Sequence, residues 1–126
     1  MDVFPTLLKL AGGDPEKYAL DGRDVLPVLT EGGKTPHDVL FWEMEGQTAL
    51  RRGDYKLVLN GRLVEEEAPK EPVFLADLSK DPGETVNLAE TLPELTKALT
   101  EEALAWREEL EQHWEERFAQ NYRSLT

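Results

Sequence analysis

The sequence predicts an α+β fold: a small antiparallel sheet of about four strands, packed against a long C-terminal helix and preceded by a short N-terminal helix. Short apolar segments separated by turn residues occupy positions 39–78, which is the pattern of successive strands. From Pro93 onward the apolar residues instead recur with a period of 3.6, as on one face of a helix. A sheet and a helix form the two layers that a hydrophobic core requires.

The chain begins with a predicted amphipathic helix. Its apolar residues follow the i, i+3, i+4, i+7 spacing of one helix face and are Phe4, Leu7, Leu8 and Ala11. Asp2 is expected to cap this helix, and Gly12-Gly13 to end it. Residues 14–36 are expected to form a loop, with one short helical turn around 25–30.

The middle of the chain predicts strands joined by tight turns. Strands are expected at 39–45, 47–51, 55–59 and 73–78, with a short return strand at 62–64. Leu40, Trp42 and Met44 alternate along one face of the first strand. Arg52-Gly53-Asp54 is expected to form one turn, and Asn60-Gly61 is a hairpin signal.

The C-terminal segment predicts one helix of about 25 residues, roughly 37 Å long. Its apolar stripe comprises Leu95, Leu99, Ala103, Trp106, Leu110, Trp114 and Phe118, and its opposite face carries Glu101, Glu102, Glu108, Glu109, Glu115 and Glu116. Trp42, Trp106 and Trp114 are in phase with apolar neighbours, so all three are expected in the core. Trp106 is expected to pack on strand residues such as Leu57 or Trp42.

Length and charge restrict the classes of function. A chain of 126 residues suits one domain, 1–126. A net charge of −12 argues against nucleic acid and against anionic membrane surfaces as partners. No apolar run approaches the ~20 residues of a membrane span, and no signal-peptide pattern is present. The chain has no cysteine, which excludes disulfides and thiolate sites but leaves the compartment open.

The most informative segment is a strand followed by a turn with defined chemistry, at residues 73–89. In Asp81-Pro82-Gly83-Glu84, the proline presets φ, the glycine accepts a positive φ, and the aspartate can bond the backbone two residues on. Asn87-Leu88-Ala89 then leads toward the long helix.

This segment resembles the C-terminal signature of the sulfatase family, the arylsulfatase-type hydrolases of the alkaline-phosphatase superfamily. Three further stretches match that family in the same order: 2–12, 20–29 and the paired strands of 40–43 and 48–58. The resemblance therefore runs nearly from end to end. One departure is Ala76, where the family usually has an aromatic residue.

The resemblance implies a parent enzyme that hydrolyses sulfate esters. Such enzymes use a formylglycine, matured from the Cys or Ser of a Cys/Ser-x-Pro-x-Arg motif, and a divalent cation, usually calcium. Neither Ser79 nor Ser124 fits that motif, and the chain contains no cysteine. We therefore assign no catalytic or metal-binding residue here, and expect no cofactor in this chain. The chain alone is expected to be inactive, and its expected partner is the missing catalytic domain.

Four residues are candidates for the rim of the parent's substrate site: His37, Glu43, Glu45 and Gln47. His37 precedes the first strand, and the other three flank the loop between the first two strands. The other histidine, His113, is expected on the acidic surface of the long helix.

Three questions stay open at the level of sequence. The chain is alternatively a self-standing acidic interaction module, or a subdomain of a related phosphonate or phosphate monoester hydrolase. Met1 directly precedes a helix that is internal in the family, which fits a recombinant fragment or a truncated reading frame. Either self-association through an exposed face or a large apolar patch near the first helix, at 4–11, is expected.

Overall fold

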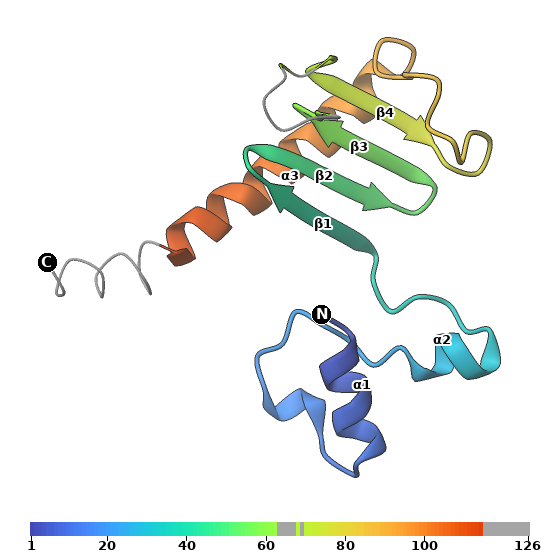
Figure 1. Ribbon diagram of the computed structural model, residues 1–126, viewed down its shortest axis with the longest axis vertical. Coiled ribbons are helices and arrows are strands. Elements are labelled where there is room, and N and C mark those ends of the chain that lie inside the picture. Colours follow the sequence, from blue (N-terminus) through green and yellow to red (C-terminus); the bar gives the residue numbers. More distant parts are fainter. Residues whose placement is uncertain (63–67, 69, 115–126) are drawn as a thin grey trace, which may run out of the picture. The chain divides into compact units, whose positions relative to one another are not determined.

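The computed structural model describes residues 1–62, 68 and 70–114 (Figure 1). The chain divides into two compact units, Met1–Asp38 and Val39–Thr126, and each is described by itself. Among the described residues, no helix is long and apolar enough to cross a membrane.

The first unit contains α1 (Val3–Leu10), a short 3₁₀ helix η1 (Pro15–Lys17) and α2 (Leu26–Glu31). Both predicted helical segments are confirmed, and Gly12 leaves α1 with a φ of 81°. The predicted capping role of Asp2 is wrong, because its side chain makes no cap hydrogen bond and is engaged elsewhere. The predicted apolar side of α1 stays largely open: Phe4 is 57% exposed and Leu7 is 58% exposed.

The second unit is an antiparallel sheet with one long helix. Its strands are β1 (Val39–Met44), β2 (Gln47–Arg52), β3 (Tyr55–Leu59) and β4 (Val73–Asp77), in the order β1-β2-β3-β4. Glu45 and Gly46 both have positive φ between the paired Met44 and Gln47, which is the two-residue turn that matches strand twist. Gly53, with a φ of 58°, makes the predicted turn before β3.

The segment after β4 closes one edge of the sheet. Asp81 accepts hydrogen bonds from the backbone N–H groups of Thr85 (2.7 Å) and Val86 (2.9 Å). The prediction that Gly83 has the positive φ of this turn was wrong, because Glu84 has it, at 52°. The Asn87 side chain then pairs with β4: its Oδ1 accepts from the Leu75 N–H, and its Nδ2 donates to the Val73 carbonyl.

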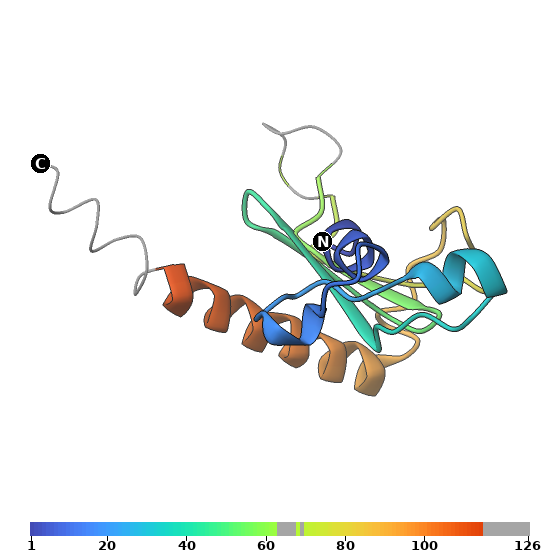
Figure 2. The same ribbon diagram turned by 90° about the horizontal axis from the view of Figure 1, so that it is seen from below.

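Helix α3 (Pro93–Trp114) packs on one face of this sheet (Figures 1 and 2). The strand register aligns Phe41, Leu50, Leu57 and Leu75 in a row across the four strands. The buried core consists of Leu50, Leu57, Leu59, Leu75, Leu99 and Ala103. The predicted α+β arrangement of sheet, long helix and short N-terminal helix is therefore confirmed.

The tryptophans differ from the prediction. Trp106 stacks on Phe41, with ring centroids 4.9 Å apart and planes 7° apart, rather than packing on Trp42 or Leu57. Trp42 is next to Phe41 in β1, so its side chain points to the opposite face, where it is 49% exposed. Trp114 is 56% exposed, so the buried stripe of α3 covers only its N-terminal part.

The acidic side of α3 is mostly solvated, as predicted, with one exception. Glu102 is partly buried and accepts a hydrogen bond from Arg52 Nε at 3.1 Å, so it contacts the sheet instead of solvent alone. Glu101, Glu108 and Glu109 are exposed. Phe118, Glu115, Glu116 and most of the expected strand at 62–64 lie outside the described residues.

Candidate functional site

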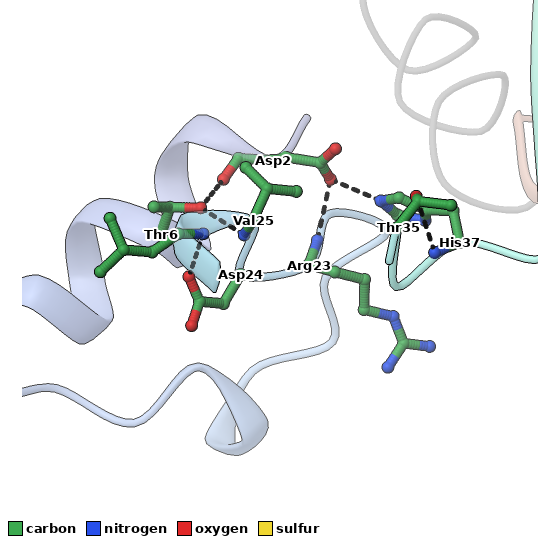
Figure 3. Close-up of polar contacts among 8 residues, drawn as sticks. Asp2, Thr6, Arg23, Asp24, Val25, Thr35 and His37 are labelled. Carbon is green, nitrogen blue, oxygen red and sulfur yellow. Dashed lines mark hydrogen bonds and ion pairs between the residues drawn. The ribbon is translucent and has the colours of Figure 1, made fainter. Parts of the chain in front are cut away.

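His37, the first rim candidate, is held inside a polar cluster of the first unit (Figure 3). Its Nε2 lies 2.8 Å from Asp2 Oδ1, and its side chain is only 10% exposed. The same Asp2 oxygen accepts from the backbone N–H of Arg23 at 2.9 Å. His37 thus joins the start of α1 to the segment before β1, and its Nε2 is already engaged.

The environment of Asp2 favours its charged form. Burial acts to raise the pKa of Asp2 by desolvation, but the Arg23 N–H and the His37 imidazole outweigh it, and the pKa is lowered. The Thr6 hydroxyl adds to the cluster by donating to the Asp2 carbonyl (2.7 Å) and accepting from the Val25 N–H (3.0 Å). These contacts fasten the loop after η1 to the first turn of α1.

Glu43 is an ion-pair partner of α3. Its Oε1 lies 3.2 Å from Arg107 Nη2, and the Glu43 side chain is 22% exposed. Arg107 Nη1 also donates to the Gly46 carbonyl and to the Thr48 hydroxyl, both at 3.4 Å. Arg107 therefore binds the β1–β2 hairpin to the helix, which gives Glu43 a structural role.

Glu45 and Gln47 differ from each other. Glu45 is exposed at the tip of the β1–β2 turn. Gln47 Oε1 accepts from the backbone N–H of Arg62 at 2.7 Å, which fixes the chain as it leaves β3. Glu43, Glu45 and Gln47 thus gather at one hairpin of the second unit, whereas His37 belongs to the first unit. Within this hairpin, Glu45 is the candidate with an exposed carboxylate.

A pocket of about 430 Å³ lies in the first unit, between α1 and the residues after it. Its charged lining residues are Lys9, Asp14, Glu16, Arg23 and Asp24. Lys9 Nζ pairs with Asp24 at 2.9 Å, which raises the pKa of Lys9. The backbone N–H of Leu26 and the same ion pair lower the pKa of Asp24. The lining carries charges of both signs, and Lys9 is paired with Asp24. The pocket therefore has no excess of positive charge that would favour an anion such as sulfate.

The residues do not fit the metal or the formylglycine that the resemblance implies. Across the described part of the chain, no group of three or more His, Cys, Asp or Glu side chains could hold a metal ion. Calcium requires several oxygen ligands gathered in one place. The sequence also offers no cysteine and no serine in the nucleophile motif. We therefore derive no step of chemistry through either group in this chain.

Local sequence pattern did not reveal the contacts that organise these residues. Asp2 and His37 are far apart in sequence, and a lone acidic residue before a helix indicates a cap. Arg107 lies beside the apolar stripe of α3, where a charged residue is typical of a solvated edge. The one available signal was the opposite charge of Arg107 and Glu43 of β1.

Comparison with known proteins gives the family. No family model matches the chain. An uncharacterized sulfatase of Schizosaccharomyces pombe is 36% identical over 121 residues, which cover 86% of this chain and 21% of that protein. Human arylsulfatase A is 36% identical over 123 residues, covering 79% of this chain and 24% of that protein. The chain belongs to the sulfatase family. It spans only about a fifth to a quarter of the length of these curated relatives.

Solved structures agree with this assignment. A structure from work on glycosaminoglycan metabolism by Bacteroides thetaiotaomicron has a TM-score of 0.60 and 27% identity, covering 79% of this chain and 23% of that one. The phosphonate monoester hydrolase of Agrobacterium radiobacter has a TM-score of 0.53 and 26% identity, covering 86% of this chain and 24% of that one. The sulfatase-type subdomain thus shares its fold with a second class of hydrolase in the alkaline-phosphatase superfamily.

Proposed function

We propose that this chain is the C-terminal structural subdomain of a sulfatase-like hydrolase, residues 1–126, and that it is inactive without a catalytic domain. In the parent, it extends the hydrophobic core and supports the edge of the catalytic domain. The parent hydrolyses sulfate esters, using calcium and a formylglycine that both belong to the catalytic domain.

One observation carries the proposal: similarity to sulfatases covers 86% of this chain, yet the match spans only 21% of the relative. The residues of this chain also act mainly in packing and in holding its elements together. The core cluster of the second unit consists of leucines and one alanine, and the Glu43–Arg107 ion pair joins the β1–β2 hairpin to α3. Residues of these kinds can support the structure of the parent enzyme.

The β1–β2 hairpin is the place where this subdomain contributes to the substrate rim. Glu45 is exposed at its tip, and the Glu43–Arg107 pair and the Gln47–Arg62 hydrogen bond hold the strands on either side. A rigid hairpin with one exposed side chain can select among substrates by charge. His37, engaged with Asp2, acts in positioning rather than in direct contact.

The test is the turnover of a chromogenic aryl sulfate by the purified chain in the presence of calcium. We expect a rate equal to that of heat-denatured chain. Turnover that survives a second purification and follows the protein peak would refute the proposal. Glu45→Gln, an exposed substitution, is the matched control for any residual signal, since a genuine site in the hairpin would respond to it.

A phosphonate or phosphate monoester hydrolase is the alternative parent, and the likeness to the Agrobacterium radiobacter enzyme keeps that class in the comparison. The curated relatives are sulfatases, and they are more similar in sequence. An assay with an aryl phosphonate beside the aryl sulfate covers both classes. An independent acidic interaction module is less well supported, because Trp106 is occupied by its stacking on Phe41.

A further inference from the structure

The dipeptide Asn60-Gly61 follows β3 directly, but it does not join β3 to β4 by a tight turn. Strand β4 begins only at Val73, so the dipeptide opens a longer connection. Asn60 is exposed and has a φ of 55°. Its backbone N–H donates to the Pro72 carbonyl at 2.8 Å, which extends the pairing of β3 with β4 by one hydrogen bond. Asn60 is therefore anchored through its N–H and open to solvent.

The groups on either side of the Asn60-Gly61 peptide bond are not engaged elsewhere. Among the described residues, no hydrogen bond holds the Asn60 side-chain amide, the Asn60 carbonyl or the Gly61 N–H. The next backbone group is held again, since the Arg62 N–H donates to Gln47 Oε1 at 2.7 Å. The peptide between Asn60 and Gly61 is thus a free link between two anchored N–H groups.

We propose that Asn60 is a site of spontaneous succinimide formation, in which the Gly61 nitrogen attacks the Asn60 side-chain amide. A bond forms between Gly61 N and Asn60 Cγ, and the bond from Cγ to Nδ2 breaks. The proton of the Gly61 N–H leaves with Nδ2 as ammonia. Water, the only co-reactant, then opens the five-membered ring at one of its two carbonyls. Opening gives aspartate at one carbonyl and isoaspartate, whose main chain runs through Cβ and Cγ, at the other.

Two features of the backbone favour ring closure. The ring holds Asn60 Cβ and Gly61 N close to one plane, which requires the ψ found at the first central residue of a type II′ turn. That residue has φ of about +60° and ψ of about −120°. The φ of Asn60 is already 55°, so closure requires rotation about ψ alone. Gly61 has no Cβ to obstruct the side chain that approaches its nitrogen.

The products change the link between the two anchored N–H groups. Each event replaces a neutral amide by a carboxylate. Isoaspartate also lengthens the main chain by one carbon atom between the Pro72 and Gln47 contacts, so we expect it to loosen the hydrogen bond from Arg62 to Gln47. The reaction is a property of this chain and does not depend on the proposed function.

Incubation of the purified chain in mildly alkaline buffer, followed by tryptic digestion and mass spectrometry, measures the reaction. The peptides 57–62 and 81–97 carry Asn60 and Asn87, and conversion replaces NH₂ by OH. Asn87 is the internal control, because its side chain is hydrogen-bonded to β4 and a bulky leucine follows it. We expect Asn60 to convert at least about tenfold faster than Asn87 in the native chain, since those hydrogen bonds must open first. Labelling by isoaspartyl methyltransferase identifies isoaspartate.

Two comparisons separate the site from its surroundings. Asn60→Gln keeps an amide but would have to close a six-membered ring, so we expect no conversion in peptide 57–62, and circular dichroism confirms that the variant is folded. Conversion of that peptide in Asn60→Gln would contradict the assignment to Asn60. Incubation in urea gives the rate of the unfolded chain, and we expect the native rate at Asn60 to lie within about tenfold of it.

A native rate at Asn60 as low as that at Asn87, with conversion only in urea, would overturn the proposal. The structural consequence has its own measurement, the hydrogen exchange of the Arg62 N–H. Exchange should be faster in chains that contain isoaspartate than in fresh chains. Equal exchange in the two would overturn the predicted loosening at Gln47.

Discussion

Replacing Trp106 by alanine tests the packing of α3 on the sheet. Trp106 is partly buried and stacks on Phe41 at 4.9 Å. Truncating a fully buried tryptophan costs about 3–5 kcal/mol, and a stacked aromatic pair adds about 0.5–1.5 kcal/mol beyond burial. Because part of the Trp106 ring remains exposed, we expect a loss of about 2–4 kcal/mol in the free energy of unfolding. A domain this small has only about 5–15 kcal/mol in total.

The assay is urea unfolding followed by far-UV circular dichroism, because this signal does not depend on the tryptophan removed. With an ordinary slope of about 1–3 kcal/mol per molar urea, the midpoint should fall by roughly 0.7–4 M. Trp114→Ala is the matched control: the same side chain is removed from the same helix, but from a position that is 56% exposed. We expect it to cost less than about 1 kcal/mol. Equal losses in the two variants would refute the assignment of the buried stripe.

Three further predictions address the core, the acidic face and the response to acid. Leu99→Ala, at a position 3% exposed, should lower the free energy of unfolding by about 2–5 kcal/mol in the same urea assay, and a loss below that range would mean that α3 is not seated on the sheet. Glu109→Gln should change the free energy of unfolding by less than ~0.5 kcal/mol. Glu102→Gln should lower it by up to ~1 kcal/mol, because Glu102 binds Arg52. A larger loss for Glu109→Gln than for Glu102→Gln would contradict the observed helix phase. The hydrogen bonds from Lys80 and Ser79 lower the pKa of Asp77, so its stabilising contribution is present above the unfolded-state pKa near 3.8 and is lost as the pH falls through the lower folded value. Asp77→Asn should therefore flatten the fall in stability between pH 5 and pH 2, and an unchanged pH profile would rule out this role.

The sequence predicted the number, order and kind of elements well because each depends on local pattern. Turn residues separated the strands, and the 3.6-residue period marked α3. Which face of β1 is buried could not be predicted, because both alternating sets are apolar: Leu40, Trp42 and Met44 on one side, Val39 and Phe41 on the other. The packing of α3 on the sheet determines which face of β1 is buried. Phe41 lies on the face that α3 covers, and Trp42 lies on the opposite face.

The candidate site was harder to predict because its contacts join residues distant in sequence. His37 and Glu43 were selected by position beside an expected loop, and the structure engages both with partners: Asp2 for the first, Arg107 for the second. An ion pair between a strand and a helix depends on how the two pack, and the sequence pattern of either element does not contain that information. Glu45 is exposed at the expected turn, and its role at a substrate rim stays a prediction.

The genomic DNA upstream of the codon for Met1 gives the most direct test of the central claim, that this chain works with a catalytic domain of the sulfatase type. We predict that the upstream DNA encodes a Cys/Ser-x-Pro-x-Arg motif together with a cluster of acidic metal ligands, either in the same reading frame or separated from it by an interruption. Upstream DNA that encodes no such motif in any frame would contradict the account.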